Sequence, residues 1–253
     1  MLCPRCGSLD RHRVMALLIP MMIANAPRSS TVLDIAPAGG LSVRLRALSP
    51  NTYVSLDLDP QADGREVDVR ADAARLPLRS ASVGFALCSH VLEHVVDDRS
   101  VAKELIRVLD PGGSILIQAP RRRGTATDEV LGLSPNERLE RYGQPDHVRL
   151  YGDDFEERLR AVGLVVATSS YRRLLPMPLL ETIGATSDHE LWVAVVDGDA
   201  AVHLDSDRVL RELAGSMLSA EPGPVSSKMP ESGGSRLRRL VARSSQPTGG
   251  NQV

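Results

Sequence analysis

The chain has 253 residues, of which 42% are hydrophobic and only 3% aromatic, so we expect one domain with an aliphatic core and short appendages. A formal net charge of −2 and a pI near 6.3 exclude a protein that binds nucleic acid through overall positive charge. No apolar run approaches the about 18 residues of a membrane span. Three cysteines without a recognisable secretory leader favour a reducing, cytoplasmic location over a disulfide framework.

Residues 1–29 form an N-terminal segment with two parts. The first part is a C-x-x-C knuckle, in which Cys3 and Cys6 are candidate zinc ligands. It has the form of half a zinc site, because tetrahedral zinc takes four ligands. The site would be completed by His12, by a second copy of the chain or by an upstream segment, or else the knuckle is a relic. In the second part, Ser8 is expected to cap a helix over residues 9–24.

Residues 30–200 alternate between short apolar runs and amphipathic stretches. This alternation predicts βαβ units and a mostly parallel sheet of the doubly wound α/β class, with ligands at the carboxyl ends of the strands. The expected strands are 31–36, 53–58, 66–69, 83–88, 114–118, 164–168 and 191–196.

Amphipathic helices are expected between these strands. One follows Gly39-Gly40, and one begins at Asp97 or Asp98 and ends before the Pro-Gly-Gly at 111–113. A further helix begins at Asp153 and ends at Gly163. Residues 201–253 are expected to contain one helix over 204–218, followed by a disordered tail rich in Gly, Pro, Ser and basic residues.

Three acidic residues and a turn of small residues stand where the first strands should end. The turn follows Asp34 and contains Ala36, Ala38, Gly39 and Gly40. Small side chains let a ligand approach the backbone and the free N–H groups of the next helix. Asp57 ends the second strand, where a carboxylate can accept hydrogen bonds from both ribose hydroxyls. Asp72 could accept from an adenine amino group. Singly, each feature is equally typical of a tight turn or a helix N-cap.

In this order, the segments resemble the class I S-adenosylmethionine (SAM)-dependent methyltransferases, in particular the type 11-like small-molecule group with an hVLEHh segment. The resemblance covers about residues 30–200. It is carried by VLDIAPAGG (32–40), YVSLDLDP (53–60), RADAARLP (70–77), FALCSHVLEHV (85–95) and ELIRVLDPGG (104–113). It implies a Rossmann-like, mostly parallel sheet of seven strands with helices on both faces and an antiparallel last strand, and it implies SAM as the cofactor.

The resemblance also implies roles for individual residues. Asp34 would organise the loop near the methionine end of SAM; Ala36, Ala38, Gly39 and Gly40 would form its floor; Asp57 would hold the ribose; Leu58 would pack on the adenine; Asp72 and the Ala73 backbone would bind the adenine edge; Ser89 and His90 would line the sulfonium side. The three carboxylates are expected to converge on this one site. Ala36 and Ala38 replace the first two glycines of the D-x-G-x-G-x-G pattern, which admits the cofactor only if neither needs a positive φ. Gly84 also stands where the family commonly has an aspartate.

The insertion at 120–152 is expected to cover the substrate, as insertions at this place do in the resembled family. Its candidate substrate residues are Arg121, His147, Arg149 and Tyr151. The phrase DHVRLYG (146–152) also resembles one subgroup whose members carry an N-terminal cysteine knuckle. No catalytic residue stands out, because SAM brings its own leaving group and positioning supplies much of the rate. Among the candidate bases His90, His94 and His147, His90 has the best position, and even it is better explained as a wall of the site.

The sequence therefore predicts SAM-dependent methyl transfer to oxygen or nitrogen of a small metabolite, with no nucleic-acid or membrane partner and with a homodimer left open. A non-catalytic SAM-binding or regulatory module of the same fold is one alternative, favoured by the two alanines and by the lack of a clear base. An NAD-dependent oxidoreductase is disfavoured by the missing G-x-G-x-x-G and by the hVLEHh segment. A nucleic-acid methyltransferase is disfavoured by the missing basic face and Pro-Pro-Tyr type of motif.

Overall fold

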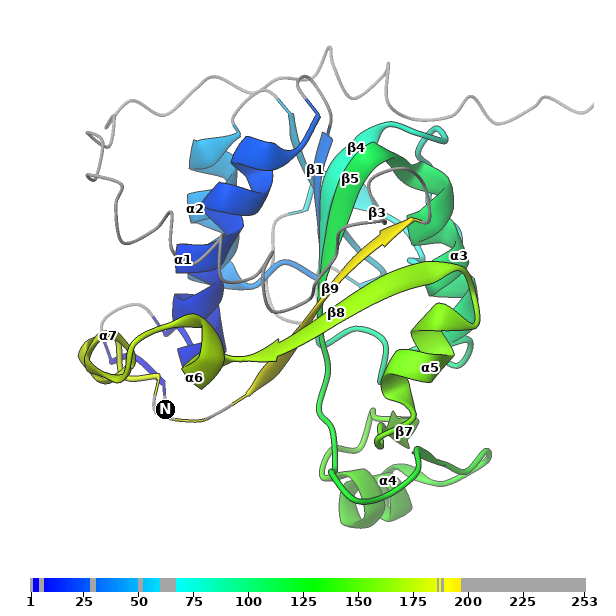
Figure 1. Ribbon diagram of the computed structural model, residues 1–253. Helices are drawn as coiled ribbons and strands as arrows, with labels where there is room; N and C mark the ends of the chain where they lie inside the picture. The colour runs from blue at the N-terminus through cyan, green and yellow to red at the C-terminus, as the bar shows by residue number, and fades with distance from the viewer. Residues whose placement is uncertain are drawn as a thin grey trace, which may run out of the picture.

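The computed structural model describes residues 2–4, 7–27, 31–49, 52–59, 67–185, 187 and 189–196. In this part of the chain a seven-stranded sheet separates two layers of helices (Figure 1). The strand order is β3-β2-β1-β4-β5-β9-β8, in which β9 alone is antiparallel to its neighbours. This is a Rossmann-like arrangement, with the antiparallel last strand that the resemblance implies.

The seven strands of the sheet overlap the seven predicted ones, β3 only at Val69. They are β1 (Thr31–Ile35), β2 (Tyr53–Asp57), β3 (Val69–Arg70), β4 (Val83–Ser89), β5 (Leu109–Gln118), β8 (Leu164–Ser170) and β9 (Glu190–Val196). The strand β5 begins five residues earlier than predicted, because the Pro-Gly-Gly lies inside it as an irregularity in its pairing with β4. Gly113 is required there, since a Cβ would lie 2.9 Å from the carbonyl oxygen of Val83.

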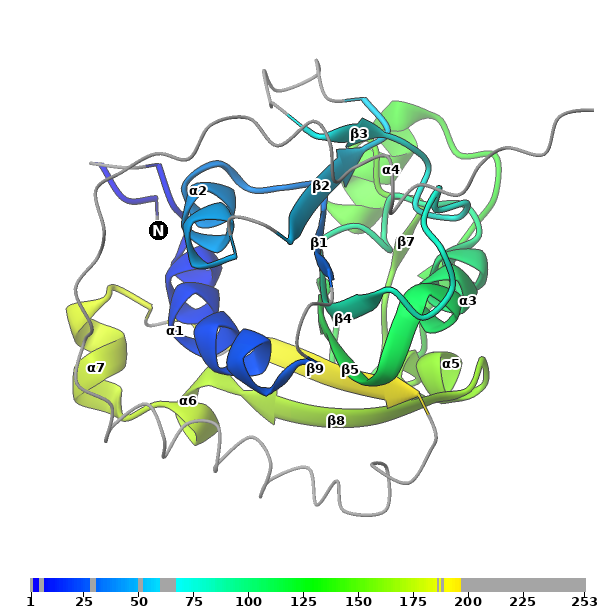
Figure 2. The same ribbon diagram turned by 90° about the horizontal axis from the view of Figure 1, so that it is seen from above.

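Two helical layers cover the sheet (Figure 2). One layer contains α1 (Asp10–Asn25), α2 (Gly39–Leu48), α6 (Tyr171–Leu174) and α7 (Met177–Thr182), and the other contains α3 (Asp98–Val108) and α5 (Phe155–Arg160). Asp97 caps α3 by accepting from the Ser100 N–H. Two predicted caps are wrong. Leu9 is the N-cap of α1 in place of Ser8, and Asp154 is the N-cap of α5 in place of Asp153.

The hydrophobic core lies on both faces of the sheet. Leu33 and Ile35 of β1 face the layer of α3 and α5, whereas Val32 of the same strand faces the layer of α1 and α2. All five residues of β1 are buried. A strand covered on both faces has no polar alternation, which explains the continuous apolar runs in the sequence.

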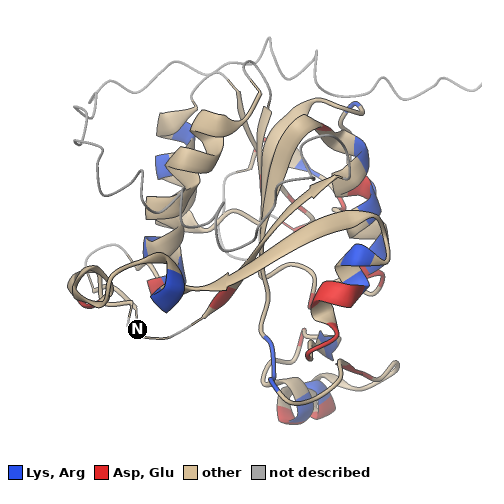
Figure 3. Ribbon diagram, viewed as in Figure 1, with Lys and Arg blue, Asp and Glu red and all other residues tan. Residues whose placement is uncertain are grey.

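The insertion after β5 folds into a small unit of its own. It contains β6 (Asp128–Glu129), α4 (Pro135–Tyr142) and β7 (Arg149–Leu150), and β6 pairs with β7. This unit extends from the carboxyl end of the sheet (Figure 1). Charged residues of both signs gather on α3, α4 and α5 (Figure 3). No helix among the described residues is long and apolar enough to cross a membrane. Cys6 and the predicted helix and tail at 201–253 lie outside the described residues.

Candidate cofactor and substrate site

The carboxyl ends of three neighbouring strands finish in one row. Ile35 is the last paired residue of β1, and it lies opposite Leu56 of β2 and Cys88 of β4. The next residues in these three chain segments are Ala36, Asp57 and Ser89. Because parallel strands end at the same edge of a sheet, this row is where a doubly wound fold binds ligands.

Asp57 and Asp72 lie on adjoining turns at this edge. The Ala71 N–H donates to the Asp57 carbonyl oxygen at 3.0 Å, which joins the turn after β3 to the end of β2. The Asp57 carboxylate accepts from the Asp59 N–H at 3.0 Å, and the Asp72 carboxylate accepts from the Ala74 N–H at 2.8 Å. Both carboxylates are therefore oriented by their own turns.

Three further residues expected at the adenine end or the methionine end differ in exposure. Leu58 is 62% exposed, which suits a side chain that packs on a ligand. Ala73 is buried. Asp34 is only 1% exposed and does not lie in the row, because its side chain points into the core and accepts from the Tyr53 hydroxyl at 2.7 Å. The convergence of the three carboxylates on one cofactor stays a prediction: Asp57 and Asp72 lie on adjoining turns, and Asp34 is held by Tyr53.

The Tyr53 side chain contacts Asp34 through its hydroxyl and a cation, Arg46, through its ring. The Arg46 guanidinium lies over the Tyr53 ring, with its carbon 4.5 Å from the ring centre. Burial and the neighbouring Asp34 charge raise the pKa of Tyr53 far above its ordinary value. Tyr53 is therefore a permanent hydrogen-bond donor to Asp34, and this pair fixes the end of β1 from inside the core.

The small-residue turn contains one backbone conformation that favours glycine. Ala36 has φ +53°, in the left-handed region, whereas Ala38 has φ −94°. Of the two alanines that replace family glycines, Ala38 therefore does not need a positive φ, whereas Ala36 does. The helix α2 begins at Gly39, where a Cβ would meet nothing within 4 Å. Open space thus borders the first turn of α2.

The end of β4 leads into a buried carboxylate. His90 has φ +55°, and its N–H donates to the Gln118 carbonyl oxygen at 2.7 Å. Its Nδ1 lies 2.9 Å from Oε1 of Glu93, whose side chain has no exposed surface. Glu93 belongs to the hVLEHh segment, but the sequence alone assigns it no role. No local pattern distinguishes a buried glutamate from an exposed one there.

His147 is brought from the insertion to this place. It is 3% exposed, and its ring meets the His94 ring edge-on with the centres 4.7 Å apart. Nδ1 of His94 lies 3.1 Å from a carboxylate oxygen of Asp146. Burial lowers the pKa of His147, so its imidazole is neutral near pH 7. The structure thus gathers Glu93, His94 and His147 next to His90.

The other three substrate candidates make internal contacts. Arg149 has no exposed surface and donates to the carbonyl oxygens of Leu92 and Val96. Tyr151 is also fully buried, and its hydroxyl donates to Asp98 at 2.8 Å. Neither side chain therefore reaches the surface of the described part of the chain.

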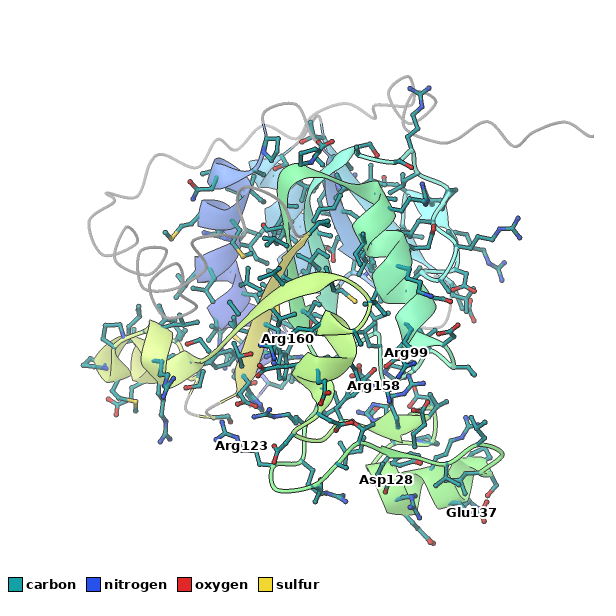
Figure 4. All side chains as sticks on the ribbon, turned by 45° about the vertical axis from the view of Figure 1, so that its right-hand side comes forward. Arg99, Arg123, Asp128, Glu137, Arg158 and Arg160 are labelled. Atoms are coloured by element: carbon teal, nitrogen blue, oxygen red, sulfur yellow. The ribbon has the colours of Figure 1, made fainter. Side chains whose placement is uncertain are left out.

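Arg121 and α5 complete the contacts of the insertion. Arg121 bonds Glu190 at 2.6 Å, and Arg123 bonds the same oxygen at 2.8 Å. Arg158 projects from α5 toward the insertion (Figure 4) and bonds both Asp98 and Glu129. These ion pairs of Arg121, Arg123 and Arg158 thus connect the insertion to the sheet domain.

Known proteins support the interpretation of the fold. Residues 33–117 match the family model described as a methyltransferase domain. The chain is 36% identical over 134 residues to an uncharacterized methyltransferase of Mycobacterium sp. (strain JLS), which covers 49% of this chain and 52% of that protein. It is 31% identical over 132 residues to a "Probable S-adenosylmethionine-dependent methyltransferase" of Mycolicibacterium smegmatis, with 49% and 50% covered.

The chain spans about half the length of the curated relatives it matches. Among solved structures, a SAM dependent methyltransferase from Archaeoglobus fulgidus matches with a TM-score of 0.49 and 15% identity, over 76% of this chain and 95% of that one. The family match runs through β1, β2, β4 and β5 and includes the whole row of strand ends. Residues 33–117 are therefore similar to a methyltransferase domain.

Proposed function

We propose that the protein is a cytoplasmic enzyme that transfers a methyl group from SAM to oxygen or nitrogen of a small-molecule metabolite. One observation carries this function: Asp57 and the turn at Ala36 end adjacent parallel strands side by side, in a row with Ser89. A carboxylate next to a turn with open space is the combination that a nucleoside cofactor requires. The cytoplasmic location is supported by the sparse cysteines.

Each group of residues at the row has a distinct task. Asp57 would hold the ribose hydroxyls, with Leu58 against the adenine and Asp72 and Ala73 at its edge. The turn at 36–40 would carry the methionine end, and the Asp34–Tyr53 pair fixes that turn from the core. Ser89 and His90 would border the methyl group. When bound, SAM supplies a methyl group on a good leaving group, so these residues align the acceptor and exclude water.

The choice of a small acceptor is supported by the surface and by the insertion. Positive and negative residues are mixed over α3, α4 and α5 (Figure 3), so this side offers no basic face for a nucleic acid. The insertion packs against residues 92–96 next to His90, through the Arg149 side chain and the Val148 N–H. Such a unit restricts access to the end of β4, which favours a small acceptor.

A non-catalytic SAM-binding module is a second candidate function. The observation that favours it is Ala36, whose methyl group occupies a left-handed position that the family pattern gives to glycine. A methyl group there narrows the turn and weakens cofactor contact with the backbone. This candidate shares the fold and the binding residues, and differs only in turnover.

Calorimetry with the full chain tests cofactor binding. SAM and S-adenosylhomocysteine should bind and NADH should not. Asp57→Ala should weaken binding of S-adenosylhomocysteine about tenfold or more, because charge-assisted hydrogen bonds are lost. The matched control is Glu140→Gln on the exposed face of α4, which should bind as the unaltered chain does.

Turnover is then followed as release of S-adenosylhomocysteine with a panel of small phenols, amines and carboxylic acids. Acceptor-dependent release supports the enzyme, whereas binding without release by any acceptor supports the second candidate. Absence of binding to both forms of the cofactor overturns both.

A further inference from the structure

We propose that Glu93, His94 and His147 bind a divalent first-row transition-metal ion at the carboxyl edge of the sheet. One ligand atom from each of these side chains lies within 4.8 Å of the other two. Among the described residues, this is the one group of three or more such side chains in reach of a common ion. The site is independent of the proposed methyl transfer.

The polar side-chain atoms of Glu93 and His147 lack hydrogen-bond partners although they are buried. Within the described residues, neither carboxylate oxygen of Glu93 and neither ring nitrogen of His147 has a hydrogen-bond partner. Nδ1 of His90 lies 2.9 Å from one Glu93 oxygen without the geometry of a hydrogen bond, and the second oxygen has no such neighbour. Burying a carboxylate without hydrogen bonds to its oxygens is unfavourable. A cation bound by Glu93 and His147 removes this cost.

The separations suit an ion of ordinary size. Ligand atoms about 2.1 Å from one ion lie about 3 to 4 Å from each other. Small side-chain rotations close the remaining gap. Asp146 engages Nδ1 of His94 at 3.1 Å and leaves Nε2 for the ion. A carboxylate that holds the second nitrogen of an imidazole is the usual support of a metal-binding histidine.

The main chain assembles the site without the ion. The Val148 N–H donates to the Glu93 carbonyl oxygen at 2.9 Å, which sets the residue after His147 against Glu93. Arg149 donates to the carbonyls of Leu92 and Val96, on either side of the two ligands in that segment. Two chain segments more than 50 positions apart are thus held in register, so the ligand set is preorganised.

The ligand types select the class of ion. Two imidazoles and one carboxylate suit Mn²⁺, Fe²⁺, Co²⁺ or Zn²⁺, whereas Mg²⁺ and Ca²⁺ prefer oxygen ligands. Three protein ligands leave coordination positions open, as in catalytic sites. The ion would lie beside His90 at the end of β4. If the acceptor is a hydroxyl, the ion would act on it as a Lewis acid and lower its pKa, so that no protein base is needed. This last point rests on the proposed function.

The experiment uses the full chain, without a purification tag and with Cys3→Ser and Cys6→Ser to remove the knuckle as a competing site. After treatment with a chelator, the protein is loaded with Zn²⁺, Mn²⁺, Co²⁺ or Mg²⁺ and dialysed. Metal content is then measured by mass spectrometry, and the visible spectrum of the Co²⁺ form is recorded. We expect one transition-metal ion per chain, no retained Mg²⁺ and a Co²⁺ spectrum with nitrogen ligands.

Variants locate the ion. Glu93→Gln and His147→Gln should each weaken Zn²⁺ binding at least tenfold, measured by calorimetry. His189→Gln is the matched control, because His189 is exposed and bonds Asp10 outside the group. Glu93→Gln retains the size of the side chain and removes a buried charge, so circular dichroism should show an intact fold. Equal Zn²⁺ binding by the variants and the control, or no retained ion in the unaltered site, overturns the site.

Binding of S-adenosylhomocysteine is measured on the same samples. Absence of metal binding by the chain with Glu93, His94 and His147 intact, together with retained S-adenosylhomocysteine binding, overturns the metal site alone. Retained metal binding in a chain that ignores S-adenosylhomocysteine overturns the proposed function alone.

Discussion

The Arg149 guanidinium donates to the carbonyl oxygen of Leu92 at 2.6 Å across 57 positions of the chain. The same side chain bonds the Glu129 carboxylate at 2.6 Å and has no exposed surface. It therefore fastens the insertion to the segment after β4. Glu93 follows Leu92 directly, and His147 precedes Arg149 by two positions. Arg149 therefore positions these two candidate metal ligands without touching an ion.

Arg149→Met should lower the free energy of unfolding by about 3 to 5 kcal/mol, because a buried carboxylate and several carbonyls lose their donor. Denaturant unfolding at neutral pH measures the loss. Arg141→Met is the matched control: Arg141 bonds Asp128, the neighbour of Glu129, but its side chain is exposed to solvent, so its substitution should change stability far less than Arg149→Met does. Equal losses in the two variants would contradict the role of Arg149 as a buried clamp.

Ala36→Gly should leave stability unchanged or raise it by up to about 1 kcal/mol. The left-handed conformation costs an L-residue about 1 to 2 kcal/mol, which exceeds the entropy cost of a glycine of about 0.5 to 1 kcal/mol. Ala38 has a negative φ, so Ala38→Gly relieves no backbone strain and should change stability by less than about 0.5 kcal/mol, because the entropy cost of glycine is offset by its preference for the N-cap position of α2. Thermal unfolding of the two variants side by side checks the difference. A loss of the same size at both positions would show that φ at Ala36 carries no strain.

The conformation of Ala36 is a feature of the fold that the sequence does not predict. The strands were predictable, because apolar runs bounded by Gly, Pro and Asp reveal elements buried on both faces. The antiparallel β9 followed from the resemblance. The φ of Ala36 was not predictable, because the crossing from β1 to α2 imposes a conformation that the alanine itself disfavours.

The substrate-side residues illustrate a second limit. Arg149 and Tyr151 lie in the segment that the resemblance assigns to the substrate, but the insertion buries both of them. Which side chains an insertion covers depends on contacts between distant segments, and local spacing carries no information about them. Glu93 and His147 meet for the same reason, since neither has a neighbour in sequence that predicts the other.

Tyr53 should make stability fall at alkaline pH. Burial and the charge of Asp34 raise its pKa in the folded protein above the unfolded value of about 10. Above about pH 10, the Tyr53 hydroxyl thus keeps its proton only while the chain is folded. Its stabilising contribution is complete below about pH 10 and decreases as the pH rises beyond that value. Denaturant midpoints from pH 8 to 11 should fall less steeply for Tyr53→Phe than for the unaltered chain. Parallel slopes would contradict the Asp34–Tyr53 contact.

Glu104 should make stability fall at acid pH. Its carboxylate bonds Arg107 twice at 2.8 Å and accepts from the Leu76 N–H, and the Arg107 contact lowers the pKa of Glu104 below its usual 4.5. As the pH falls, Glu104 is therefore protonated in the unfolded chain before it is protonated in the folded chain. The stabilising contribution of Glu104 is present above about pH 4.5 and decreases below it. Glu104→Gln should cost about 1 to 2 kcal/mol at pH 7 and much less at pH 3, measured by urea unfolding. Glu140→Gln, on the exposed face of α4, should change little at either pH. A deficit of Glu104→Gln that persists undiminished at pH 3 would mean that packing, rather than the charge pair with Arg107, is the source of its stabilisation.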